Sequence, residues 1–178
     1  KPRTALTTAL GNRDANRIGI EWGNRWNNHQ LDLGFNHSSS PKQNIARIGS
    51  EQDGSSQRTA TLGVRSNFHD ALRFDAQRRH TRSKVDFDAI DFSSTGLPTD
   101  GDNHTDSEGW LGSLALRHQV SDQFAQSLIY QGSQSTNHTQ DQTYGANRSE
   151  GNKRKLQWLG QWQSSQHGIS AALERETE

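Results

Sequence analysis

The chain has 178 residues, and its 20 Lys and Arg residues balance 20 Asp and Glu residues. This balance argues against a nucleic-acid-binding protein, because phosphate recognition needs a basic excess. Only 28% of the residues are hydrophobic, whereas a soluble globular domain is nearer half apolar, so one closed core is hard to build. Disorder is disfavoured because the chain has 5 Trp and only 3 Pro. A wet β-protein, or a barrel whose inner wall faces water, remains.

Apolar and polar residues alternate along many short segments, and a period of two predicts strands with one apolar and one wet face. No segment keeps a helical period, and none is apolar enough for a transmembrane helix. We therefore expect an all-β chain without helices. Nine strands are predicted in chain order, at about 3–11, 15–26, 29–40, 56–68, 71–87, 109–120, 124–137, 152–163 and 167–176.

The predicted connections fall into two groups. Tight polar turns lie at 27–28, 69–70, 121–123 and 164–166, whereas long polar connections lie at 41–55, 88–108 and 138–151. Gly, Pro, Ser and Asp mark the long ones as exposed loops. Short turns at one end and long loops at the other are typical of an antiparallel transmembrane β-barrel, periplasmic below and extracellular above. The predicted fold is thus a segment of about nine strands from a larger up-and-down barrel.

The pattern also predicts which side of the wall meets lipid. The outward set is Ile18, Ile20, Leu31, Leu33, Leu62, Val64, Leu72, Phe74, Leu114 and Leu116. Arg73, Asp75 and Gln77 should point to the other side. We expect the five Trp residues near strand ends, as in the aromatic girdles of membrane barrels, with core packing as the alternative. These Trp residues are Trp22, Trp26, Trp110, Trp158 and Trp162.

Several short motifs, in their order and spacing, resemble the barrel of TonB-dependent outer-membrane receptors, most closely the cobalamin-transporter branch. They lie at 1–5, 44–47, 49–54, 87–89, 96–100, 157–158, 167–169 and 173–174. The resemblance covers nearly the whole chain. It implies that residues 1–178 are the front part of a barrel of about 22 strands, without the N-terminal plug domain and its TonB-contacting box.

Acidic residues form the clearest candidate site. Calcium takes six to eight oxygen ligands, and clustered carboxylates beside a flexible Gly can supply them. The resemblance implies that Glu51, Asp53, Asp88 and Asp100 are calcium ligands in loops that the ion orders before substrate binds. We expect the 41–55 and 88–108 connections to approach each other at the extracellular end. The alternative is that these acids only solvate the loops.

The resemblance implies a bacterial outer-membrane protein that imports cobalamin or an iron–siderophore through TonB, with membrane lipid around it. No catalytic residues are expected, because the sequence holds no nucleophile elbow, phosphate loop or zinc-site spacing. A soluble, β-rich, calcium-dependent module, for example one that binds carbohydrate, is the alternative function. An outer-membrane barrel enzyme is a third class, without a catalytic signature here.

Overall fold

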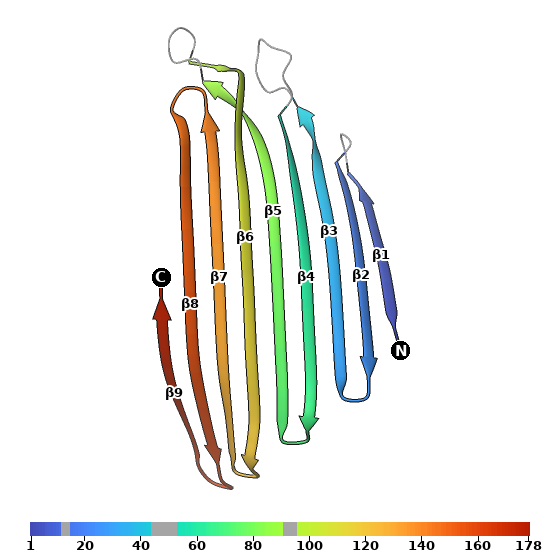
Figure 1. Cartoon of the computed structure of the whole chain (residues 1–178), viewed down its shortest axis with the longest axis vertical. Coiled ribbons are helices and arrows are strands. Elements are labelled where there is room, and N and C mark those ends of the chain that lie inside the picture. Colours follow the sequence, from blue (N-terminus) through green and yellow to red (C-terminus); the bar gives the residue numbers. More distant parts are fainter. Residues whose placement is uncertain (12–14, 44–52, 91–95) are drawn as a thin grey trace.

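The computed structural model describes residues 1–11, 15–43, 53–90 and 96–178. These ranges form one sheet of nine antiparallel strands in the order β1 to β9, each paired with its chain neighbours (Figure 1). The strands are β1 (Arg3–Leu10), β2 (Asn16–Trp26), β3 (His29–Gln43), β4 (Asp53–His69), β5 (Leu72–Ile90), β6 (Pro98–Ser121), β7 (Phe124–Asp141), β8 (Gly145–Gln163) and β9 (Gly168–Thr177). The predicted all-β meander is confirmed.

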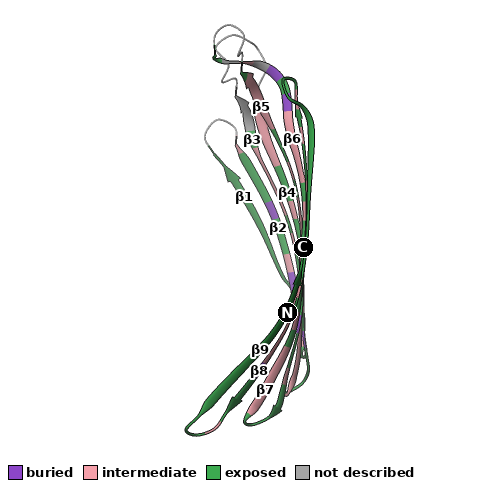
Figure 2. Ribbon diagram, turned by 90° about the vertical axis from the view of Figure 1, so that its left-hand side faces the viewer, coloured by how far each residue is buried: buried purple, intermediate pink, exposed green. Residues whose placement is uncertain are grey.

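The described ranges contain strands and turns but no helix. Within them, then, no helix is long and apolar enough to cross a membrane. The sheet is a single curved and twisted layer (Figure 2). Strands β1 and β9 are its two edges, so it is not closed. Among the described residues, Ala115 is the only buried hydrophobic one. Because the layer has no interior core, its two faces are the surfaces to examine for a functional site.

The tight turns at the lower end of Figure 1 agree with the predictions. They join β2 to β3, β4 to β5, β6 to β7 and β8 to β9. At the first of these, Asn27 has a φ of 48°, in the left-handed region that Asn tolerates better than most residues. All four turns are short and, apart from Ala71, polar, which agrees with the predicted end of tight turns.

The upper ends of the strands differ from the predictions. Strand β6 begins at Pro98, and a turn of three residues, 142–144, joins β7 to β8. Most of the predicted loop 88–108 and nearly all of the predicted loop 138–151 are therefore paired strand. The reason is that backbone pairing needs no apolar face. Hydroxyl side chains pair across these ladders, with 3.0 Å between Oγ1 of Thr105 and Oγ1 of Thr139, and such pairs stabilise a sheet.

Strand register places the alternating residues on two faces. Directly opposed residues of an antiparallel pair lie on the same face. Ala76 opposes Leu114, Leu114 opposes Tyr130, and Tyr130 opposes Leu156. The same register places all ten members of the predicted outward set on the face of Leu114. Asp75 opposes Ala115 and lies on the opposite face. The predicted division between the two faces is confirmed.

Candidate functional site

One face, here called the apolar face, carries a continuous belt of hydrophobic residues over all nine strands. No element of the described chain covers it: Leu114 is 47% exposed and Leu128 is 46% exposed. Its main members are Leu6, Ile18, Ile20, Trp22, Leu31, Leu33, Phe35, Leu62, Val64, Leu72, Phe74, Leu114, Leu116, Leu128, Tyr130, Leu156, Trp158, Trp162, Ile169 and Leu173. Soluble proteins rarely expose an apolar patch of this extent.

The belt has the same height on β7 and β8. It runs from Phe124 to Tyr130 in β7 and from Leu156 to Trp162 in β8. Six residue steps at about 3.4 Å give roughly 20 Å. This height is slightly less than the apolar band of about 25 Å on membrane barrels.

Aromatic and charged groups border the belt above. The rings of His80 and Trp110 are stacked with their centroids 4.0 Å apart, and the Arg78 guanidinium lies 4.0 Å from the Trp110 ring centroid. His80 Nε2 lies 2.9 Å from a carboxylate oxygen of Glu108. The polar ends of such a cluster need water or headgroups, whereas the indole body tolerates hydrocarbon.

Below the belt, Trp26, His29 and Phe68 form a second aromatic group. The ring centroid of His29 lies 6.0 Å from that of Trp26 and 6.4 Å from that of Phe68. Trp26 and Trp162 lie at or next to strand ends, as predicted. Trp22 and Trp158 lie four and five residues before the lower ends of β2 and β8, and these ends are where they were predicted. Trp110 does not lie near a strand end, because β6 begins at Pro98, so for Trp110 the prediction is wrong.

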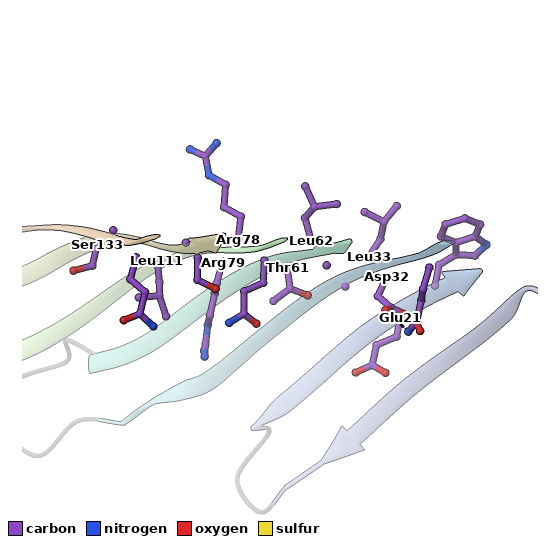
Figure 3. Close-up of a pocket in the computed structure, with 18 of the residues that line it drawn as sticks. Glu21, Asp32, Leu33, Thr61, Leu62, Arg78, Arg79, Leu111 and Ser133 are labelled. Atoms are coloured by element: carbon purple, nitrogen blue, oxygen red, sulfur yellow. Dashed lines mark hydrogen bonds between the residues drawn. The ribbon is translucent and has the colours of Figure 1, made fainter. Parts of the chain in front are cut away.

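The other face, here called the polar face, carries charged, amide and hydroxyl side chains. Figure 3 shows the alternation: Leu33, Leu62 and Arg78 point to one side, whereas Glu21, Thr61 and Arg79 point to the other. A broad hollow of about 720 Å³ lies along the middle of the sheet, and Glu21, Thr61 and Arg79 contribute to its lining. A few apolar residues, such as Ile129 opposite Ala115, interrupt the polar face.

Three arginines from adjacent strands converge on one carboxylate of the polar face. Arg65 Nε and Arg73 Nε each lie 2.8 Å from an oxygen of Asp75, and Arg117 on β6 forms a third ion pair with it. The Asp75 side chain is 22% exposed. Through these three ion pairs, one carboxylate connects β4, β5 and β6.

A second group of ion pairs joins β8 to β9. Lys155 Nζ lies 2.8 Å from Glu174, and Lys153 Nζ lies 2.6 Å from Glu176. A dry core would not accept this density of charge, but a water-filled lumen would.

The predicted calcium ligands lie at the upper end of the sheet, as far as they are described. Asp53 begins β4 and Asp88 lies near the end of the adjacent β5, so the two occupy the same end of neighbouring strands. Glu51 lies outside the described residues. Asp100 is in β6, and its side chain lies outside the description. The approach of the 41–55 and 88–108 connections stays a prediction.

Asp88 stands at an irregularity of the β5–β6 ladder, where the register shifts between Phe87 and Ala89. Both of its carboxylate oxygens are buried and lack a hydrogen-bond partner within the described part of the chain. A buried carboxylate without a partner is costly unless a cation or a proton compensates it. Asp88 therefore fits a cation ligand. The described residues hold no group of three or more His, Asp or Glu side chains that could complete a metal site.

Asn103 is a polar residue whose burial the sequence did not predict. It is 2% exposed and lies near the start of β6, the part of that strand that bends in Figure 1. Its Oδ1 accepts a hydrogen bond of 2.8 Å from the backbone N–H of Gln142, in the turn between β7 and β8. The amide thereby ties the bend of β6 to that turn. Asn in a polar stretch carries no signal of burial, so the sequence could not reveal it.

No protein-family model matches the chain, and no curated protein sequence matches it either.

Proposed function

We propose that the chain is a wall segment of a bacterial outer-membrane β-barrel, and that the complete barrel is a TonB-dependent uptake receptor for cobalamin or an iron–siderophore. The observation that carries the membrane placement is the contrast between the faces of one uncovered layer. The apolar face meets lipid, and the polar face, with its ion pairs around Asp75, lines a water-filled lumen. The sheet edges at β1 and β9 pair with further strands of the barrel.

Strand length supports a tall barrel with a surface above the membrane. About 9–11 residues of a tilted strand cross a bilayer, whereas β6 has 24 residues and β8 has 19. Because the belt lies toward the lower turns, the excess length projects from the extracellular side. The wall there is mostly polar on both faces, with exceptions such as Val85 and Ile90, which suits the capture of a large polar ligand. The ligand class and the TonB dependence rest on the motif resemblance.

Calcium binding at the upper end belongs to the same proposal. Asp88 and Asp53 would hold the ion, together with Glu51 and Asp100. The ion would supply positive charge and oxygen coordination where carboxylates gather. The buried carboxylate of Asp88 is the group with most to gain. Ordering of the upper strand ends would then favour the conformation that binds substrate.

The alternative, a soluble calcium-dependent binding module, needs a second layer over the apolar face. The described chain supplies none, and Leu33, Leu62 and Leu116 are 44%, 41% and 41% exposed. This alternative predicts that the protein stays monomeric in buffer without detergent. The membrane proposal predicts aggregation there, because open edges and an apolar face associate in water.

Uptake tests the transport role. Cells that express the full-length protein as their sole candidate receptor are given radiolabelled cobalamin or a labelled ferric siderophore, with and without TonB. We expect accumulation of one ligand only when both the protein and TonB are present. Accumulation that is independent of TonB would remove the receptor assignment while leaving the barrel intact.

A further inference from the structure

Two glycines interrupt the apolar face at the upper border of the belt. Gly112 on β6 directly opposes Gly132 on β7. On the outer sides of this pair, Arg78 on β5 opposes Gly112, and Arg154 on β8 opposes Gly132. One row across four strands therefore reads Arg, Gly, Gly, Arg. Neither central position carries a side chain, which leaves a notch between two arginines whose Cα atoms lie about 14 Å apart, or three strand spacings.

Side chains of opposite character wall this notch. Trp110 and Gln134 form the row above it, and Leu114 and Tyr130 form the row below it. These residues, the two glycines and both arginines line a cavity of about 530 Å³. A Cβ atom built on Gly132 would lie 3.8 Å from the Tyr130 hydroxyl, so this phenol lies at the edge of the notch. The site is cationic at its sides and apolar toward the belt.

The two arginines differ from the two lysines that β8 carries on the polar face. Among the described residues, neither Arg78 nor Arg154 has a carboxylate within ion-pair distance, whereas Lys153 and Lys155 pair with glutamates of β9. Arg78 instead contacts the Trp110 ring, which holds its guanidinium at the notch. The notch thus combines two uncompensated guanidinium groups with an adjoining hydrocarbon surface.

We propose that this notch binds a phosphorylated lipid of the surrounding membrane, with its phosphate between Arg78 and Arg154 and its acyl chains along the apolar face below. Guanidinium groups bind phosphate through paired N–H donors. Trp110 and Tyr130 place amphipathic rings at the level of the headgroup. The acyl chains cover Leu114, Leu116 and Leu128. This inference rests on the proposed membrane placement of the apolar face.

The test uses the detergent-solubilised full-length protein and lipid A, a phosphorylated and multiply acylated glucosamine lipid, with binding measured by native mass spectrometry. The Arg78→Gln, Arg154→Gln double variant should weaken binding at least tenfold. The matched control is Arg79→Gln, Lys153→Gln, which removes the same charge one residue away, on the polar face. It should stay within twofold of the wild type. Equal binding by the two double variants would overturn the proposal.

A steric variant tests the notch independently of charge. Gly132→Val fills it with a strand-compatible residue, and its Cβ meets only ordinary contacts of 3.8 to 3.9 Å. It should weaken lipid A binding while the protein keeps its unfolding temperature in detergent without the lipid. Unchanged binding by this folded variant would contradict the proposed seat of the phosphate.

Two further ligands distinguish the sources of affinity. Dephosphorylated lipid A should bind at least tenfold more weakly than lipid A, and glucosamine phosphate without acyl chains should also bind weakly. Equal binding of the dephosphorylated lipid would overturn the role of the arginines. Tight binding of the soluble phosphate would overturn a lipid as the occupant. If lipid labels do not reach Leu114 in reconstituted protein, the membrane placement itself fails. If the labels do reach Leu114 but the two double variants bind lipid A equally, the lipid site is wrong and the membrane placement stands.

Discussion

The two faces of the sheet share one backbone ladder but differ in almost every other respect. On the apolar face, the row from Ala76 to Leu156 offers only hydrocarbon and one phenol to its surroundings. One residue away, Asp75 accepts ion pairs from three arginines. No single solvent suits both faces, since water is unfavourable for the first and hydrocarbon is prohibitive for the second. A wall between lipid and water satisfies both.

The comparison also explains why a layer without a core can be stable. Backbone hydrogen bonds between neighbouring strands are complete along most of the ladder. In the proposed barrel, lipid would take the place of a core on one side, and cross-strand ion pairs add connections on the other. The account therefore predicts that substitutions one residue apart have very different effects, according to the face that carries them.

The largest effect is expected from a charge on the apolar face. Leu114→Arg in the middle of the belt should destabilise the full-length protein in phospholipid vesicles by about 2–4 kcal/mol. Ser113→Arg, one residue away on the polar face, should change stability by less than about 1 kcal/mol, because water reaches it. Urea titrations of both variants measure the difference. Equal losses would mean that the two faces meet the same environment.

A smaller effect is expected on the polar face. Asp75→Asn leaves Arg65, Arg73 and Arg117 close together without their shared carboxylate. We expect a loss of about 1–2 kcal/mol, limited by the partial exposure of the arginines. High salt should reduce the loss, since it screens the repulsion. Adding Arg73→Gln should restore part of the stability. The control Asp86→Asn removes a single ion pair, with Lys84 at 3.2 Å, and should cost less.

The calcium prediction concerns the upper end and has the smallest expected magnitude. Calcium at tenfold its dissociation constant should stabilise the full-length protein by about 1.4 kcal/mol. Asp88→Asn should abolish this gain. Without calcium, the same variant should be slightly more stable than the wild type, because it removes a buried charge that has no partner within the described ranges. Thermal unfolding with calcium and with chelator measures both the gain in stability from calcium and the difference between the variant and the wild type without it. Asp86→Asn is the matched control. If the two variants respond equally to calcium, the acidic residues at the upper end are ordinary solvated groups and not calcium ligands.

The lower half of each strand could be predicted from the sequence because period two and tight polar turns carry the information there. Leu31, Leu33 and Phe35 mark a face without ambiguity. The upper halves could not, because residues such as those at 138–141 are polar on both faces, and a strand that is wet on both sides resembles a loop. The burial of Asn103 and the notch between Gly112 and Gly132 depend on pairing across strands, which a single sequence does not display.

The orientation of the apolar face toward lipid is the central claim, and β7 offers the most direct test. These 178 residues contain no cysteine. Once any cysteines elsewhere in the full-length protein are replaced by serine, single cysteines at Leu128, Ile129, Tyr130 and Gln131 can carry a fluorescent label in the reconstituted protein. Quenching by brominated lipids should be strong at 128 and 130 and weak at 129 and 131. Ile129 is decisive, because it is as hydrophobic as Leu128 but lies on the polar face, opposite Ala115. Strong quenching at 129, or none at 128, would contradict the account.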